Sequence, residues 1–278
     1  MGSSVDSGFS AFRHWVRGLG IALFCCAAIL AQVPAPAERG SAIAKGGFRN
    51  ETEIAGKFNA WKTDTEAKIW LVAMGYRAAE IESVEATKPH GEKSDVVVAV
   101  TTRSGTRMEG ISIKLVSTAK GFNQIDKRWL SHYVEKWKMP KDVADSLKLF
   151  LGETKPARSG RNADRLFLDE LDGAEQRSVV AFFEANRSRV AADLFMGDGP
   201  YSAKWILVAQ KAGDKPRWEL RSIGDAMKYF SDGKVTITRG GNLRIGRITM
   251  QRKGGDGGRE TAKMLQFKID PAELFDLK

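Results

Sequence analysis

The stretch from Ser94 to Val116 constrains the fold more than any other part of the chain. Two segments within it, Asp95–Thr101 and Met108–Val116, are rich in valine, isoleucine and threonine. Between them stands Ser104-Gly105, a signal for a tight turn. The stretch therefore predicts two antiparallel β-strands joined as a hairpin.

Three polar side chains are expected on one face of this hairpin. A two-residue loop at Ser104-Gly105 would place Asp95 opposite Lys114, and opposed residues point to the same side. Ser112 shares that face because side chains alternate along a strand. Such a group suits metal-assisted phosphodiester hydrolysis, in which a carboxylate holds Mg²⁺ and a lysine positions water. It is equally consistent with an ordinary Asp–Lys cross-strand pair, worth less than about 1 kcal/mol.

Composition narrows the partners and excludes several chemistries. The chain has 278 residues with 42% hydrophobic content, enough for a real core. Its net charge of +10 favours a polyanionic partner, either nucleic acid or an anionic membrane. Cys25 and Cys26 are adjacent, so they cannot form a zinc cluster or cross-link the fold. His14, His90 and His132 lack metal-ligand spacing, which argues against zinc hydrolases and nucleases with a histidine base.

Residues 1–40 form an apolar leader. Arg13 and Arg17 precede the apolar run Leu19–Ala31, and the small residues of AQVPAPA follow it, as in a secretory signal peptide. The run is short for a membrane span of about 20 residues. Three interpretations remain: a spurious extension from an upstream start codon, a signal on an exported nuclease, or a membrane anchor. We favour the first.

Apolar periodicity predicts an alternation of helices and strands along the remaining chain. Helices are expected over Glu51–Trp61, Thr65–Met74, Ile125–Lys138, Asp142–Leu151, Gly173–Asn186, Arg187–Phe195 and Asp225–Phe230. Further strands are expected over Ile81–Ala86, Ala203–Gln210, Trp218–Ser222, Lys234–Thr238, Ile245–Gln251 and Met264–Ile269. The pattern indicates an α/β fold in which the later strands extend one sheet.

Two more regions carry groups suited to nucleic acid. Ser117–Gln124 is expected to be a loop, and the amides of Asn123 and Gln124 can donate and accept at base edges. Helix capping explains Asn123 equally well. The second region is the glycine-rich loop RKGGDGGRETAK, which would let the backbone approach a groove, although a solvated turn has the same composition. The candidates there are Gln251, Arg252, Lys253 and Arg259.

Several of these segments resemble a known family. Asp95 followed by Ser112-Ile113-Lys114 is similar to the short PD-(D/E)XK nuclease signature. Two longer segments are more specific, KLVSTAKGFNQIDKRWLSHYVEKW from Lys114 and QRKGGDGGRETAKMLQFKIDPAELFDL from Gln251. They resemble the small type II restriction endonucleases of the MspI-like group, most closely those that cut GCGC. The resemblance runs from about Lys45 onward.

The resemblance implies one domain over residues 41–278, with a mixed central sheet flanked by helices and a C-terminal hairpin that reads DNA. It implies a cytoplasmic type II enzyme, monomer or homodimer, that hydrolyses both strands of duplex DNA at GCGC and leaves 5′-phosphates. A DNA methyltransferase would protect the host sites. Mg²⁺ would be held by Asp95, the Ser112 position and the Ile113 carbonyl, while Lys114 positions the water. Gln124 would contact DNA.

Two positions depart from the family pattern. Ser94 stands in place of the usual proline, and Ser112 stands where an acid or amide is usual. A hydroxyl is a weaker Mg²⁺ ligand than a carboxylate. Glu109 has the wrong parity to replace it unless a bulge shifts the strand. Glu51 or Glu53, on the first expected helix, could supply a carboxylate instead.

Three alternative functions therefore stay open. A structure-specific repair or junction nuclease would use the same chemistry without a sequence rule. A protein that lost catalysis through Ser112 would bind specific DNA and leave it intact. If the leader is a true signal, the chain would be an exported nonspecific nuclease.

Overall fold

The hairpin of β2 (Val96–Thr102) and β3 (Gly105–Val116) is the centre of the first of two sheets. In this computed structural model the described residues are 36–117, 121–212, 215–255 and 258–277. The predicted leader lies outside them, apart from residues 36–40. Those five residues belong to the first turns of helix α1, which starts at Pro36. The expected start of this helix at Glu51 is therefore wrong.

The register of the hairpin differs from the prediction by two residues. Thr102 pairs with Gly105, so the loop is Arg103-Ser104 and not Ser104-Gly105. Gly105 has φ of +117°, and this conformation lets it begin β3 directly after the turn. Val96 pairs with Ile111, which places Asp95 opposite Ser112 and not Lys114. A shift of two residues preserves the face of every side chain, so the predicted convergence survives the error.

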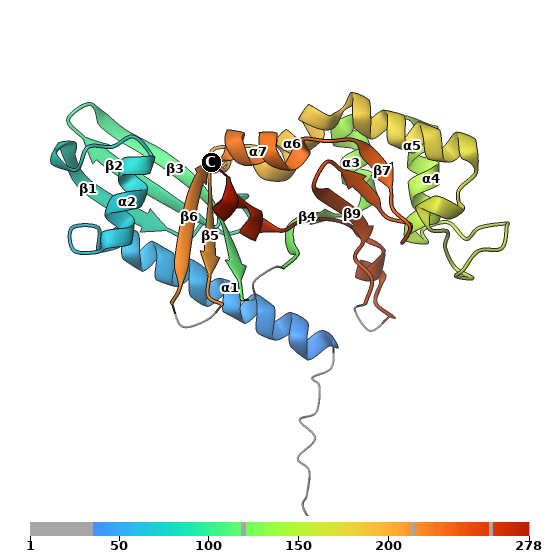
Figure 1. Cartoon of the computed structure of the whole chain (residues 1–278), viewed down its shortest axis with the longest axis horizontal. Helices are drawn as coiled ribbons and strands as arrows, with labels where there is room; N and C mark the ends of the chain where they lie inside the picture. The colour runs from blue at the N-terminus through green and yellow to red at the C-terminus, as the bar shows by residue number, and fades with distance from the viewer. Residues whose placement is uncertain (1–35, 118–120, 213–214, 256–257, 278) are drawn as a thin grey trace, which may run out of the picture. The chain divides into compact units, whose positions relative to one another are not determined.

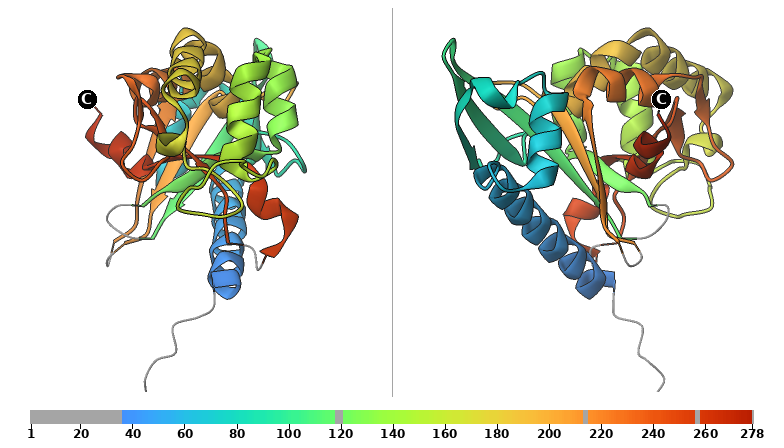
Figure 2. Two further views of the ribbon diagram at one scale, coloured as in Figure 1. Left: turned by 90° about the vertical axis from the view of Figure 1, so that its right-hand side faces the viewer. Right: turned by 60° about the vertical axis from the view of Figure 1, so that its left-hand side comes forward.

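The first sheet is mixed and has the strand order β1-β2-β3-β5-β6. Its other strands are β1 (Ile81–Thr87), β5 (Trp205–Gln210) and β6 (Arg217–Ser222), and β1 and β6 form its edges. All its neighbours are antiparallel except β3 and β5, which run parallel. Helices α1 (Pro36–Asn59) and α2 (Thr65–Ala73) cover one face, where Phe58 and Trp70 join the hydrophobic core (Figures 1 and 2).

The second sheet is separate, with the order β4-β10-β9-β8-β7. Its strands are β4 (Asn123–Arg128), β7 (Val235–Ile237), β8 (Leu243–Ile245), β9 (Ile248–Arg252) and β10 (Leu265–Ile269). The expectation that β7 extends the first sheet is therefore wrong. The expected strand Ile245–Gln251 is two strands, because the chain reverses at Gly246, whose φ is +58°.

Five helices pack around the second sheet and the remaining face of the first (Figure 1). They are α3 (Leu130–Trp137), α4 (Lys141–Leu151), α5 (Gly173–Ala185), α6 (Arg187–Phe195) and α7 (Ile223–Ser231). Tyr133 and Trp137 are fully enclosed in this core, so the aromatic spacing around α3 reflects packing. Residues Ala35–Lys278 form one compact unit.

The segment around β4 is the clearest error of local prediction. We expected a loop up to Gln124 and a helix from Ile125, but residues 123–128 form a strand and the helix begins at Leu130. β4 is a strand because it pairs with β10, far along the sequence. Local periodicity contains no information about such a partner.

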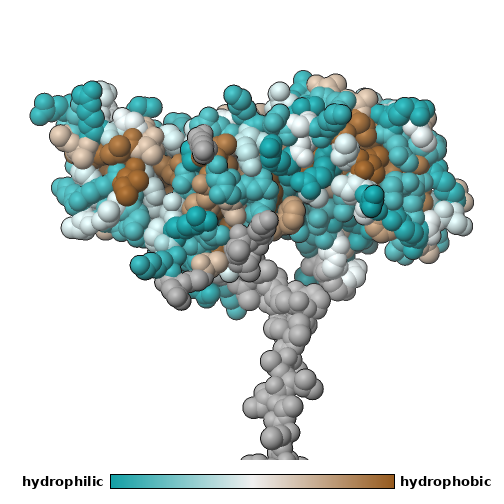
Figure 3. Space-filling view, viewed as in Figure 1, coloured by the Kyte–Doolittle hydropathy of each residue, from teal (hydrophilic) through white to brown (hydrophobic). Residues whose placement is uncertain are grey.

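The surface in Figure 3 is mostly hydrophilic, with a brown patch over α2 where Ile69 and Val72 are 60% and 62% exposed. Across the described part of the chain, no helix combines the length and apolar character needed to cross a membrane.

Candidate active site

The three polar residues predicted on the hairpin meet at one point. Asp95 Oδ2 accepts a hydrogen bond from the Ile113 backbone N–H at 2.6 Å. The same oxygen lies 3.4 Å from Ser112 Oγ and 3.9 Å from Lys114 Nζ. The Asp95 side chain is 29% exposed and that of Lys114 is 13% exposed, so both reach the surface from a well-packed strand pair. Their roles stay predictions, but their convergence is a fact of the fold.

Lys114 is fixed from two sides. Its Nζ donates to the Ile113 carbonyl at 3.1 Å and faces the Asp95 carboxylate. Because Asp95 makes all these contacts through Oδ2, its Oδ1 has no protein partner among the described residues. The site therefore offers one ammonium group and one uncommitted carboxylate oxygen side by side.

Ser112 is buried, with 4% of its surface exposed. Its hydroxyl points to Asp95, and its position between Ile111 and Ile113 keeps it inside the sheet. In this arrangement Ser112 orients the carboxylate as well as adding an oxygen to the group.

The alternative acids lie elsewhere. Glu109 is 2% exposed and accepts hydrogen bonds from Tyr76 Oη at 2.7 Å and Trp205 Nε1 at 3.0 Å. Burial and this carboxylate raise the pKa of Tyr76. Glu51 is paired with Lys88 at 3.1 Å, and Glu53 with Lys211 at 2.5 Å.

Each of these three acids is therefore committed to its own partners. In the described ranges, no cluster of three or more acidic, histidine or cysteine side chains could hold a metal ion.

Lys93 is a site residue that the sequence analysis missed. Its Nζ donates to the carbonyl of Ile125 at 2.7 Å, and also to the carbonyl of Leu194. Burial lowers the pKa of Lys93 to about 8; Asp126 opposes that shift and the charge of Lys114 adds to it. Lys93 stands two residues before Asp95, in the irregular segment that leads into β2.

Lys93 joins three elements at the site. Ile125 belongs to β4 and Leu194 to α6, so one ammonium group connects the start of the hairpin to both. Gly197 passes closely over its stem: a Cβ there would lie 2.6 Å from Lys93 Cβ, and its φ is +67°. A narrow gap at this point, with no room for a water molecule, is lined by Lys93, Ser112, Lys114, Ile125, Leu194, Phe195, Ile206 and Ile223.

A buried ionic network holds β4 in place. Asp193 on α6 is 5% exposed and accepts from Arg128 at 3.1 Å, Lys136 at 2.6 Å and Trp137 Nε1 at 2.9 Å. These donors come from β4 and α3. The network therefore stabilises β4, the strand that accepts a hydrogen bond from Lys93 at Ile125 and carries the predicted DNA-contacting residues Asn123 and Gln124.

The predicted DNA-contacting residues divide into two groups. Gln124 on β4 and Gln251 on β9 are linked through Gln266, a residue of β10 that the sequence analysis also missed. Asn123 begins β4 beside Gln124. Arg252 is not part of this group, because its Nε donates to the Leu151 carbonyl at 2.9 Å.

The other two basic candidates follow β9. The backbone N–H of Lys253 donates to the Met264 carbonyl, and Arg259 stands directly before the short helix Glu260–Lys263. They flank the glycine-rich turn, as the sequence predicted.

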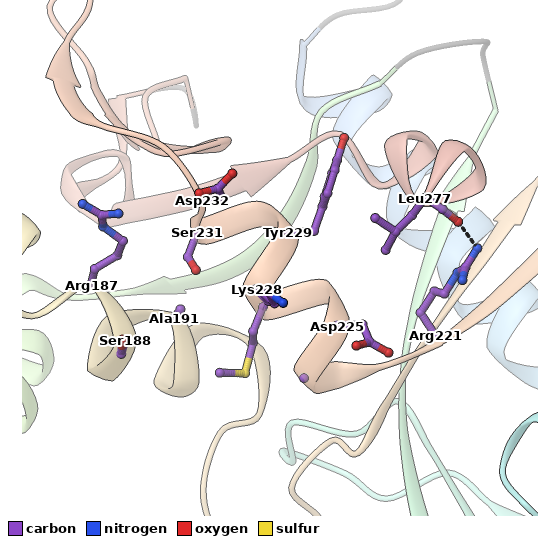
Figure 4. A pocket seen from close by; sticks show the side chains of 12 residues that line it. Arg187, Ser188, Ala191, Arg221, Asp225, Lys228, Tyr229, Ser231, Asp232 and Leu277 are labelled. Carbon is purple, nitrogen blue, oxygen red and sulfur yellow. Dashed lines mark hydrogen bonds between the residues drawn. The ribbon is translucent and has the colours of Figure 1, made fainter.

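A wider cavity lies away from the hairpin (Figure 4). It has a volume of about 900 Å³ and is lined by residues of α6, α7, β6 and the segment ending at Leu277. Figure 4 shows Arg187 and Lys228 together with Asp225 and Asp232, so charges of both signs line it. Asp95, Ser112 and Lys114 do not line this cavity.

A mixed central sheet flanked by helices, whose central hairpin brings an acid and a lysine together, is the arrangement expected of the restriction endonuclease fold. The chain belongs to the R.HinP1I restriction endonuclease family, because residues 74–275 match that family. It is a type II restriction endonuclease. The matched range includes Asp95, Lys114, Gln124 and Gln251, and the predicted family and fold class are both confirmed.

A solved structure gives an independent comparison of the fold. The chain is similar to restriction endonuclease MspI, whose crystal structure contains its cognate DNA. The two share 14% sequence identity with a TM-score of 0.58, over 85% of this chain and 94% of MspI. A search of curated proteins found no match.

Proposed function

We propose that this chain cuts both strands of duplex DNA at GCGC in a Mg²⁺-dependent reaction and leaves 5′-phosphate ends. The observation that carries the proposal is the 3.9 Å approach of Lys114 Nζ to Asp95 Oδ2 on the central hairpin of a chain from this family. The choice of GCGC rests on the resemblance of the segments after Lys114 and Gln251 to the family members that cut this sequence.

Lys114 has the position of a water-orienting residue. Its ammonium group can hold the attacking water through one hydrogen bond and stabilise negative charge that develops on the phosphate. The water oxygen bonds to phosphorus as the bond to the 3′ oxygen breaks, giving a 5′-phosphate and a 3′-hydroxyl. The bond from Lys114 to the Ile113 carbonyl limits its motion, so little orientation is lost during the reaction.

The donor set at Asp95 fits a magnesium ion. Mg²⁺ prefers oxygen ligands, and it keeps several waters while binding one or two carboxylates. The uncommitted Oδ1 of Asp95, the Ile113 carbonyl and the Ser112 hydroxyl are oxygen donors on or beside one strand face. When bound there, Mg²⁺ would polarise the phosphate and lower the pKa of a coordinated water.

The charge of the protein agrees with a DNA substrate. A net charge of +10 favours association with the phosphate backbone, and this attraction weakens as salt rises. The family resemblance adds a cytoplasmic setting and a cognate methyltransferase to the proposal. It leaves monomer and homodimer as the two modes of acting on a palindrome.

One observation favours a second candidate function. Ser112 supplies a buried hydroxyl where the family pattern has an acid or amide, and no other acid contacts Asp95 among the described residues. Weak metal binding would leave a protein that recognises its site without cutting it.

The deciding experiment is digestion of plasmid DNA by the purified full-length chain with Mg²⁺. The control is the same plasmid methylated at GCGC, and the cut ends are sequenced. Fragments that end at GCGC, absent from the methylated control, would support the proposal.

Other outcomes would identify the rivals. Intact DNA together with a specific gel shift would indicate the binding protein. Cleavage only at forks or junctions would indicate a structure-specific nuclease, and unselective degradation would indicate a nonspecific one.

A further inference from the structure

Three glutamines on neighbouring strands form a hydrogen-bonded row, which we call the glutamine row: Gln124 on β4, Gln266 on β10 and Gln251 on β9. Gln266 Nε2 donates to Gln124 Oε1 at 2.7 Å, and Gln251 Nε2 donates to Gln266 Oε1 at 3.2 Å. Gln266 lies directly opposite Gln251 in the strand register. The row therefore crosses three adjacent strands.

The row lies on the face of the second sheet that points away from the hydrophobic core. Leu265 and Phe267, the neighbours of Gln266 along β10, are fully buried in that core. Alternation along the strand directs Gln266 to the opposite face. Gln266 itself is 8% exposed, whereas Gln124 is exposed and Gln251 is half-buried. The ends of the row are accessible and its middle is covered.

Gln266, the middle residue, determines which hydrogen-bonding group Gln124 and Gln251 leave free. A glutamine amide has one oxygen acceptor and one nitrogen donor group. Because Gln266 gives its nitrogen to Gln124 and its oxygen to Gln251, Gln124 keeps its nitrogen and Gln251 keeps its oxygen. In the described residues, neither of these two groups has a protein partner. If all three amides turned over, the ends would exchange roles and would still be opposite.

We propose that Gln266 is a specificity-determining residue that acts through Gln124 and Gln251, making one end of the row a donor and the other an acceptor. This inference rests on the proposed function, because the ends are taken to meet base edges of the DNA. In the major groove guanine presents acceptors and cytosine a donor, so opposed ends match one base of each kind. Gln266 contacts no base and positions the two residues that do.

The test uses two substitutions in the full-length chain. Gln266→Met keeps the length of the side chain and removes both hydrogen bonds. Gln266→Glu can only accept, so Gln251 would donate to it as before, while Gln124 would turn over to donate as well and leave its oxygen free. The matched control is Gln176→Met on α5, where the glutamine donates to the Leu171 carbonyl.

The measurement is the cleavage rate at GCGC and at every single-base variant of it, in one pool of duplexes, read by sequencing the cut ends. Gln266→Met should lower the preference for GCGC by about tenfold, the effect of losing one directed base contact. Gln266→Glu should shift the preference at one position towards a base that offers a donor. Gln176→Met should keep the wild-type ratios.

Two results would overturn the inference. One is a uniform fall in rate at all sequences in both Gln266 variants, as expected for a merely structural glutamine. The other is an unchanged preference. If wild type itself shows no preferred sequence, the proposed function fails instead, so the two failures are distinguishable.

If a Gln266 variant does not fold, a second measurement leaves Gln266 in place. The effects of Gln124→Met and Gln251→Met on sequence preference should be non-additive in the double variant, because the two residues are linked through hydrogen bonds to Gln266. The combined loss of preference should be smaller than the product of the single losses. Strict multiplication of the two effects would overturn the inference.

Discussion

The central hairpin and the glutamine row achieve convergence in opposite ways. Asp95 and Lys114 come together through one tight turn, and their contact is local in sequence. Gln124 and Gln266 are separated by 142 positions and meet only because β4 pairs with β10. The proposed catalytic group is thus built from residues of one hairpin, while the proposed DNA-reading glutamine row is built from residues far apart in the sequence. The two should respond differently to mutation.

Asp95→Ala is expected to separate cleavage from DNA binding most strongly. Removing the carboxylate should lower the cleavage rate on the order of a thousandfold while DNA binding changes little, because no residue of the glutamine row is touched. Plasmid cleavage and gel shift measure the two properties. Asp145→Ala, which removes an exposed acid paired with Lys141 and Lys148 on α4, is the control. Cleavage retained in Asp95→Ala would refute the active-site assignment.

The next largest effect is expected from a substitution that weakens the ionic network holding β4. Asp193→Ala would leave Arg128 and Lys136 without their buried partner and should lower the free energy of unfolding by about 3 kcal/mol. Urea denaturation measures this change. Sequence preference should fall with stability, since β4 carries Gln124. A loss below about 0.5 kcal/mol, the size of an ordinary surface substitution, would show that the network is not needed to hold β4.

Lys93 joins the two regions and gives a pH-dependent test. Its pKa is about 8 in the folded chain and 10.5 ordinarily, so between these values the unfolded chain binds more protons. Wild-type stability should therefore rise between about pH 8 and pH 10.5, by about 1 to 3 kcal/mol relative to Lys93→Met. The difference is lost as the pH falls through 8. Urea unfolding at both ends of the window measures it.

The control for Lys93 is Lys68→Met, in which an exposed lysine of α2 is removed. It should follow the wild-type curve across the same window. Parallel curves for wild type and Lys93→Met would show that Lys93 is not held as the structure describes.

The smallest effect is expected within the hairpin itself. Ser112→Gln supplies an amide oxygen, the group that the closest family members carry there by resemblance. The cleavage rate should be kept or raised, and the Mg²⁺ concentration for half-maximal rate should fall several-fold, because an additional oxygen reaches the ion. A rate titration with Mg²⁺ measures both. A large loss of activity would mean that the hydroxyl of Ser112 orients Asp95 and has no role as a ligand.

The same contrast explains what the sequence could predict. The hairpin, α4 to α7 and the first-sheet strands follow from apolar periodicity and turn residues, which are local properties. The register error at Gly105 did not affect the face of Asp95, because an even shift conserves parity. β4 was missed because NQIDKR is polar and has no strand pattern of its own. Gln266 was missed because its partners are on other strands.

Lys93 was missed for a related reason. Lys93 lies in a polar loop, and its two acceptors are backbone carbonyls, which no side-chain motif can predict. The roles of Asn123, Lys253 and Arg259 stay predictions from the resemblance. Sequence reasoning thus predicted the convergence of Asp95, Ser112 and Lys114 and the fold class, but not the contacts that tertiary pairing creates.

The pairing of β4 with β10 also has a consequence during synthesis. Ribosomes add about 5 to 20 residues per second, so β4 waits roughly 7 to 30 seconds for its partner across the 142 positions between Gln124 and Gln266. During that interval its edge is open to other strands, a recognised hazard for aggregation. Asp126, Lys127 and Arg128 place charges along this edge. Charges on an open strand edge discourage pairing with other strands, so the polarity that hid β4 from prediction also suits the interval before β10 is made.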